Sequence, residues 1–148
     1  MKKIAIWILP IMILLTCCQK KASFALVQSE ATVDRIEIIW VYNWFDYDPD
    51  DTDTFEICYT ISKEQHSTFL EDLYDVPCYK YRNDPIQGFG QNTIRVTYSD
   101  GAFEMIGARS VYYETADGEW KYPTYYFDAE AFEDLIAAYK TGTSLYES

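Results

Sequence analysis

Two Asp-Gly pairs constrain the fold of this chain more than any other feature of its sequence. Asp100-Gly101 follows a segment, 92–98, in which apolar and polar residues alternate, and Asp117-Gly118 follows a second strand-like segment. Asp-Gly between such segments is typical of tight β-hairpin turns, and strands joined by these turns must be antiparallel. We therefore expect the second half of the chain to form an antiparallel sheet.

Two helices are expected beside this sheet. Ser62 begins an S-x-x-Q capping box, apolar residues recur at helical spacing after it, and Pro77 ends the pattern. Near the end of the chain, Asp128 precedes apolar residues at i, i+3, i+4 and i+7, and Gly142 suits the end of that helix. Amphipathic helices need an apolar surface to cover, and one face of the sheet offers it.

The first half of the chain contributes two more strands. Segment 35–45 is rich in β-branched and aromatic residues, as in a central strand, and segment 54–61 alternates as in a half-buried strand. Together these elements predict an α+β fold with the order ββαββββα. It consists of one twisted antiparallel sheet, of about five to six strands, with both helices packed on one face.

The N-terminal residues have the form of a secretory signal. Lys2 and Lys3 precede twelve apolar or small residues, from Ile4 to Leu15, that are interrupted by Pro10. A membrane-spanning helix needs about 20 residues, so this run is too short to cross a bilayer comfortably. An N-terminal anchor helix that is never cleaved is the alternative interpretation.

The apolar run ends in Leu14-Leu15-Thr16-Cys17. This stretch resembles the lipobox of bacterial lipoprotein signals, in which the chain is cleaved just before a Cys that receives a diacylglycerol. The resemblance implies that Cys17 is lipidated, with palmitate-type chains, and Cys18 is the alternative in the next frame. As a whole, the chain is similar to small lipoproteins of Gram-positive bacteria, which are anchored on the extracytoplasmic face of the cell membrane. A stable anchor of this kind needs two or more acyl chains.

Cleavage at that point leaves an acidic protein. The formal net charge is −12, and the loss of Lys2 and Lys3 makes it −14. An acidic body repels phosphate groups, which argues against nucleic acid as a partner, whereas Lys20 and Lys21 lie where the lipid head groups are expected. We expect residues 1–16 to be the signal peptide, 17–32 the lipidated Cys and a tether, 33–142 one α+β domain and 143–148 a C-terminal tail. The alternative for the tether is that Phe24, Leu26 and Val27 begin a strand.

Aromatic residues are abundant and gather on the last predicted strands. The 148 residues include 14 Tyr, 8 Phe and 4 Trp. Cross-strand aromatic pairs stabilise antiparallel sheets, so a structural role is the more common one. Because the helices cover only one face of the sheet, some rings are nevertheless expected to be exposed, and an exposed aromatic patch marks a recognition surface. The candidate residues for a protein or cell-envelope carbohydrate partner are Tyr112, Tyr113, Trp120, Tyr122, Tyr125, Tyr79, Tyr81 and Arg82.

Four aspartates between the first two strands form a weak calcium candidate; they are Asp46, Asp48, Asp50 and Asp53. Alternating Asp residues bind Ca²⁺ in EF-hand loops, but Asp51 stands where that loop requires Gly, and Ile57 where it requires a bidentate Glu. The alternative is a solvated loop whose charges oppose edge-to-edge association of sheets. No metal and no cofactor are therefore expected.

Cys58 and Cys78 remain after the anchor cysteines are set aside. Outside the cytoplasm such a pair can oxidise. A disulfide between them closes a loop of about 20 residues and stabilises the fold by about 3 kcal/mol if it is unstrained. Two free, packed thiols are the alternative, and the sequence leaves both open.

Signals of catalysis are few. The single histidine, His66, has no nucleophile near it in the sequence, so it supports neither a catalytic triad nor a zinc site. A cell-wall hydrolase remains a third hypothesis, because three carboxylates fall on neighbouring predicted strands: Glu104, Glu114 and Glu119.

Two other hypotheses rank before it. The first is a non-catalytic binding module that uses the aromatic sheet surface. The second is an inhibitor or immunity-type protein that blocks an enzyme through its acidic surface.

Overall fold

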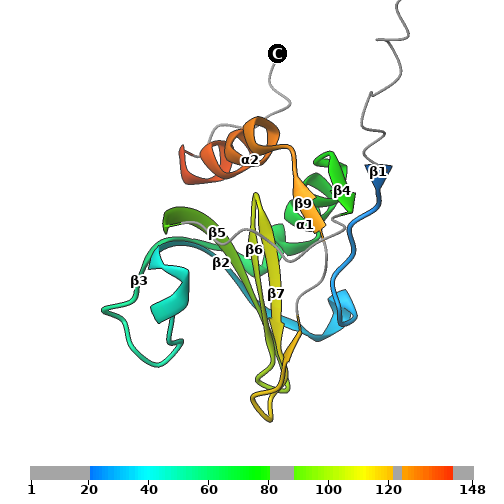
Figure 1. Cartoon of the computed structure of the whole chain (residues 1–148). Coiled ribbons are helices and arrows are strands. Elements are labelled where there is room, and N and C mark those ends of the chain that lie inside the picture. Colours follow the sequence, from blue (N-terminus) through cyan, green and yellow to red (C-terminus); the bar gives the residue numbers. More distant parts are fainter. Residues whose placement is uncertain (1–20, 81–88, 122–124, 142–148) are drawn as a thin grey trace, which may run out of the picture.

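Two antiparallel sheets and two α-helices make up the described part of the computed structural model, residues 21–80, 89–121 and 125–141 (Figure 1). The helices are α1 (His66–Asp75) and α2 (Ala129–Thr141), and short 3₁₀ turns are η1 (Glu30–Thr32), η2 (Trp44–Asp46) and η3 (Lys63–Gln65). The strands are β1 (Lys21–Ala22), β2 (Val33–Asn43), β3 (Phe55–Ile61), β4 (Cys78–Lys80), β5 (Phe89–Tyr98), β6 (Phe103–Gly107), β7 (Ser110–Glu114), β8 (Trp120–Lys121) and β9 (Tyr125–Phe127).

The larger sheet has the strand order β3-β2-β5-β6-β7-β8, and the smaller has the order β1-β4-β9. The α+β class is confirmed, but the prediction of a single sheet with the order ββαββββα is wrong. The expected last strand is divided between the sheets, because β8 pairs with β7 whereas β9 pairs with β4. Pro123 lies in sequence between the two parts, and proline cannot continue a ladder of hydrogen bonds.

Both Asp-Gly turns occur where the sequence placed them. Gly101 and Gly118 have φ angles of 90° and 80°, a region that glycine adopts without strain. At the first turn, the N–H of Tyr98 donates to the carbonyl of Ala102 at 2.8 Å, and at the second the N–H of Thr115 donates to the carbonyl of Glu119 at 2.9 Å. These turns set the register of β5 with β6 and of β7 with β8.

The helices begin and end close to the predicted points. Asp128 accepts a hydrogen bond from the N–H of Ala131, as an N-cap residue should, and α1 ends at Asp75, before Pro77. At the start of α1, Ser62 makes no side-chain cap bond and instead donates to Gln65, so a 3₁₀ turn precedes the helix.

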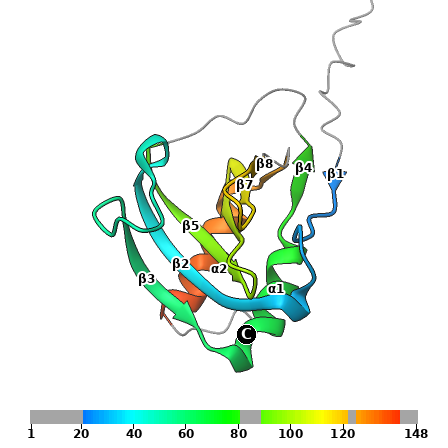
Figure 2. The same cartoon turned by 90° about the horizontal axis from the view of Figure 1, so that it is seen from below.

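The larger sheet carries an apolar cluster on each face. The helix face holds the main core, in which α1 and α2 pack on rows such as Ile38, Ile94 and Ile106 from three neighbouring strands. Figure 2 shows the same arrangement from below, with the second sheet lying to one side. The outer face, on the other side of the sheet, carries a smaller cluster: Ile39, Val41, Trp44, Phe55, Phe103, Met105 and Tyr112. Among the described residues, no α-helix covers this face; Trp44 of η2 and Tyr47 pack there instead.

Residues 21–32 belong to the folded domain, which corrects the expected tether over 17–32. β1 pairs with β4, and the ring of Phe24 lies 5.1 Å from that of Phe127 and 5.7 Å from that of Tyr125. Phe24 is only 5% exposed. The remaining tether residues, 17–20, lie outside the described residues, as do the signal peptide and the tail at 143–148.

A buried carboxylate fastens this N-terminal segment to the sheet. Glu104 lies on the helix face of β6, fully buried, and its Oε1 accepts hydrogen bonds from the hydroxyl of Tyr98 and from the N–H of Val27. Its Oε2 has no hydrogen-bond partner among the described residues. Burial raises the pKa of Glu104 above its ordinary value, although both hydrogen bonds act in the opposite direction.

The variant Phe24→Ala is expected to destabilise the domain by about 3–5 kcal/mol, because it removes a large buried ring. Val27→Ala is the matched control, since its side chain is 47% exposed and its backbone bond to Glu104 is kept; it should change stability by less than about 0.5 kcal/mol. Urea unfolding of both variants measures the difference. Equal, small effects would show that residues 21–32 are only a tether.

The variant Glu104→Gln keeps an oxygen for both donors and removes the buried charge. The pKa of Glu104 is raised in the folded state. Its contribution to the free energy of unfolding is therefore fully present below the pKa of the unfolded state, about 4.5, and is lost as pH rises through the folded-state pKa. The melting temperature of the variant relative to wild type should therefore increase between pH 4 and pH 8 in thermal unfolding. Glu56→Gln, at an exposed position, controls for the loss of one negative charge. A difference that stays constant with pH would contradict the prediction.

Candidate functional site

An aromatic row crosses the outer face of the larger sheet from β3 to β8. The ring centroids are 5.5 Å apart for Phe55 and Tyr47, 6.3 Å for Tyr47 and Phe103, 5.9 Å for Phe103 and Tyr112, and 3.6 Å for Tyr112 and Trp120. Trp120 stands at the edge of the sheet and is 49% exposed, whereas Tyr112 is 2% exposed. The row therefore has a buried body and one open end.

The sequence-predicted aromatic residues do not form a single surface. Trp120 is exposed, but Tyr112 and Tyr113 are buried, so their expected exposure is wrong. Tyr79 and Tyr125 are half-buried on the smaller sheet, away from the aromatic row. Three of the candidates, Tyr122, Tyr81 and Arg82, lie outside the described residues.

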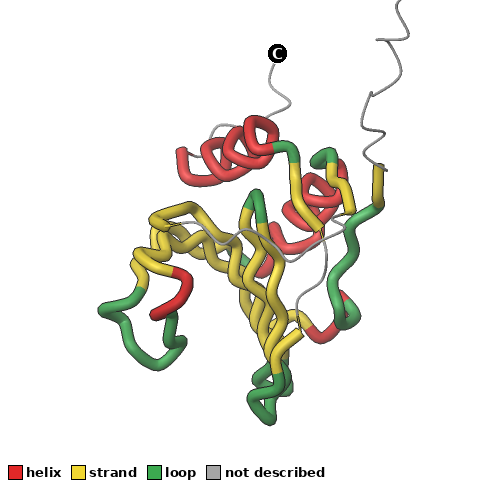
Figure 3. The backbone as a smooth tube through the Cα atoms, in the orientation of Figure 1, coloured by secondary structure: helices red, strands yellow, loops and turns green. Residues whose placement is uncertain are grey.

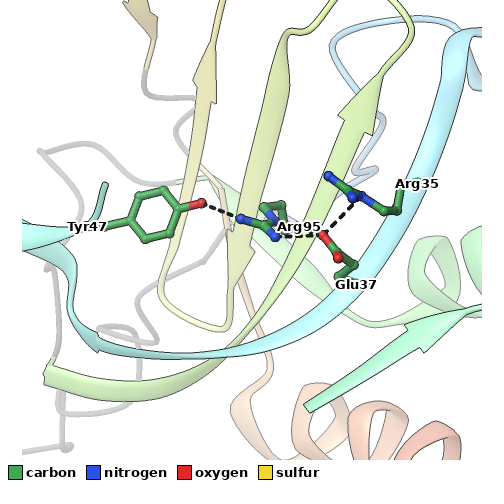
Figure 4. A network of polar contacts seen from close by, with 4 residues as sticks. All are labelled: Arg35, Glu37, Tyr47 and Arg95. Carbon is green, nitrogen blue, oxygen red and sulfur yellow. Dashed lines mark hydrogen bonds and ion pairs between the residues drawn. The ribbon is translucent and has the colours of Figure 1, made fainter. Parts of the chain in front are cut away.

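A buried ion pair lies next to Tyr47 of the aromatic row (Figure 4). Glu37 and Arg95 face each other across β2 and β5, and the Nη2 and Nε atoms of Arg95 lie 2.8 Å and 2.9 Å from Oε2 of Glu37. The Nη1 of Arg95 donates to the hydroxyl of Tyr47 at 3.1 Å, and Arg35, half-exposed, lies 3.4 Å from the same Glu37 oxygen. The guanidinium also lies 4.5 Å from the ring centroid of Phe55.

This network positions the loop between β2 and β3. Burial is the main cause that raises the pKa of Tyr47, so its phenol stays protonated at neutral pH while its oxygen accepts from Arg95. The guanidinium thus binds both a strand neighbour, Glu37, and the loop that covers the outer face. The sequence analysis did not identify this pair; its only signal was an acidic residue between the isoleucines of β2 and a basic residue between Ile94 and Val96 of β5.

Unpaired polar atoms gather at the other end of the outer face, around Gly107. Buried atoms of Trp44, Gln91, Thr93 and Ser110 have no hydrogen-bond partner among the described residues. Thr93 and Ser110 flank Gly107 in register, and a Cβ added to Gly107 would lie 3.2 Å from Nε2 of Gln91 and 3.3 Å from Cζ2 of Trp44. Each unpaired group costs about 1–3 kcal/mol. All four atoms are buried by protein, so solvent does not reach them in this structure.

The aspartate-rich loop is organised by its own hydrogen bonds. Asp48 Oδ1 accepts from the N–H of Asp50 and Asp51 Oδ1 from the N–H of Asp53, both at 2.9 Å. Among the described residues, no three His, Cys, Asp or Glu side chains are grouped so that they could hold a metal ion. Asp48 and Asp51 thus act as turn residues, each holding the backbone two residues further on.

Cys58 and Cys78 are free thiols in the structure, so the disulfide is not formed. They lie on different sheets, Cys58 on β3 and Cys78 on β4. Cys78 donates to the carbonyl of Ala22 at 3.2 Å, and burial raises the pKa of its thiol, which keeps it protonated.

The three candidate carboxylates do not converge. Glu104 is on the helix face, whereas Glu114 is on the outer face, where it accepts from the hydroxyl of Tyr112 at 2.6 Å. Glu119 is exposed and lies in the turn between β7 and β8. A sheet separates the first two, so they cannot act together on one bond.

Within the described ranges, no helix is both long enough and apolar enough to cross a bilayer. Comparisons of the chain with protein-family models, with curated proteins and with solved structures find no match.

The ion pair generates a stability prediction. Arg95→Met leaves Glu37 buried without its main partner and should cost about 3–5 kcal/mol in urea unfolding. The double variant Glu37→Gln/Arg95→Met removes both charges and should recover a substantial part of that loss. Tyr47→Phe removes only one hydroxyl and should cost about 0.5–1.5 kcal/mol. Additive effects of the Glu37 and Arg95 substitutions would show that the two side chains are not coupled.

Proposed function

We propose that this chain is a lipid-anchored, extracytoplasmic protein that binds a partner without catalysis, through the exposed end of the aromatic row. The observation that carries the proposal is the position of Trp120. Its ring lies against Tyr112, whose hydroxyl is held by Glu114, so a large aromatic side chain is both half-exposed and supported from below. Supported aromatic residues of this kind dominate the binding energy of many interfaces.

The anchor is supported by the sequence and by where the domain begins. Leu14-Leu15-Thr16-Cys17 resembles a lipobox, and the first described strand, β1, lies only four residues after Cys17 in the sequence. The acidic charge of the body fits a protein or carbohydrate partner better than a nucleic acid. Separation of Glu104 from Glu114 removes the carboxylate pair that would have favoured a hydrolase.

A second candidate function is that of an inhibitor or immunity-type protein, and one observation favours it. The acidic loop between β2 and β3, with Asp48, Asp50, Asp51 and Asp53 exposed, projects from the body (Figure 3). Internal turns hold this loop in shape, and a rigid acidic projection suits a basic site on an enzyme.

The anchor is tested with the native protein. Mass spectrometry of the processed chain should show a diacylglycerol on an N-terminal Cys17, and Cys17→Ala should move the protein from the membrane fraction to the soluble or secreted fraction, or leave it unprocessed. Cys18→Ala is the matched control and should leave the acyl mass in place. An intact N-terminal Met1 or a product without acyl mass would refute the anchor.

The binding surface is tested by photo-crosslinking in intact cells. A crosslinking residue at position 120 should give an adduct of discrete mass, and one at the exposed position 63 should not. Trp120→Ala should abolish partner binding, because it removes the exposed ring while leaving the row behind it. Asp50→Asn/Asp51→Asn should leave binding intact. Loss of binding in the loop variant alone would favour the inhibitor-type function instead.

A further inference from the structure

The smaller sheet is the part of the domain nearest to the proposed lipid. β1 begins at Lys21, and the four residues from Cys17 to this strand span at most about 14 Å when fully extended. The head-group layer of one leaflet is about 5–7 Å thick. If Cys17 carries acyl chains, as the proposed function requires, then β1 lies within about 10 Å of the head groups. The side chains around β1 would therefore lie close to the lipid head groups.

Tyrosine and lysine side chains surround this point. Lys21, Tyr79 and Tyr126 lie side by side across β1, β4 and β9, and the two tyrosine rings stack with centroids 5.2 Å apart. The next residue on β4, Lys80, is exposed, and its Nζ lies 5.7 Å from the ring centroid of Tyr125. Tyrosine rings favour the level of the head groups, and lysine favours anionic lipid.

The direction of the strands puts the basic residues at the end nearest to the anchor. Lys21 pairs with Tyr79 and Ala22 pairs with Cys78, so the chain preceding Lys21 leaves β1 at the Lys80 end of the sheet. An acidic residue, Asp128, lies at the other end, where its N–H donates to the carbonyl of Pro77, next to Cys78.

The most acidic part of the domain lies far from this sheet. Figures 1 and 2 both show β1 on the side of the molecule opposite to the loop between β2 and β3. That loop carries the exposed aspartates described above. An anionic surface that attracts Lys21 and Lys80 would repel this loop. The basic residues and the acidic loop therefore favour the same orientation, with the smaller sheet toward the surface.

We propose that the end of the smaller sheet formed by Lys21, Tyr79, Lys80 and Tyr126 docks on an anionic phospholipid surface and orients the domain on the membrane. The inference rests on the proposed lipid anchor but adds to it, because an anchor alone leaves the orientation open. In the docked orientation the acidic loop points away from the bilayer.

The test is lysine acylation of the purified lipidated protein in vesicles, followed by mass spectrometry. Lys21 and Lys80 should react about fivefold more slowly in vesicles of phosphatidylglycerol than in vesicles of phosphatidylcholine. Lys63 is the internal control: its side chain is 74% exposed, it lies in η3 just before α1, and its rate should be the same in both vesicles. In the variant Tyr79→Ser/Tyr126→Ser the protection of Lys21 and Lys80 should decrease.

Each outcome separates the inference from the proposed function. If the protein carries acyl mass and floats with both kinds of vesicle, but Lys21 and Lys80 react as Lys63 does, then the docking surface is wrong and the anchor stands. If the protein carries no acyl mass and does not float with vesicles, the anchor itself is wrong and the docking proposal fails with it. Slower reaction of all three lysines in phosphatidylglycerol would show a general effect of the surface and would also overturn the docking proposal.

Discussion

The pairing of β2 with β5 joins the two halves of this protein, and the ion pair between Glu37 and Arg95 specifies its register. A shift of β2 by one residue would move Glu37 from the outer face into the apolar core under the helices and leave Arg95 on the outer face without its partner. With this register set, Ile36 and Ile38 meet α1 and α2, while Ile39 and Val41 face the loop. The same guanidinium binds Tyr47, so the covering of the outer face depends on it too.

Local signals in the sequence predicted the elements better than their arrangement. Each Asp-Gly turn and the cap at Asp128 act within a few residues, so their structural consequences could be inferred directly. The second sheet could not be predicted, because β1 and β4 contain two and three residues and show no periodicity. Their pairing joins segments that are far apart in the sequence and depends on Phe24 packing beside Phe127.

The candidate site was predicted in part, for a similar reason. Aromatic residues on both faces of a strand indicated that the outer face matters, and Trp120 is indeed exposed. The burial of Tyr112 depends on a neighbouring ring, Phe103, and on the loop residue Tyr47, which the pattern of β7 alone cannot reveal. The burial of Arg95 also depends on a residue of another strand. A basic residue in an alternating strand is usually exposed, but here the acidic partner Glu37 on β2 makes its burial possible.

The N-terminal segment connects the proposed anchor mechanically to the body. Phe24 is packed in the core, and Glu104 holds the backbone of Val27, so the residues that follow β1 cannot swing as a flexible tether would. A force applied at Lys21 is therefore transmitted to the six-stranded sheet within a few residues. If Cys17 is lipidated as proposed, a short anchor on this segment would limit the orientations of the domain, and the proposed docking of Lys21 and Lys80 would select among those that remain. The exposed ring of Trp120 would consequently be presented at a restricted angle and height above the membrane.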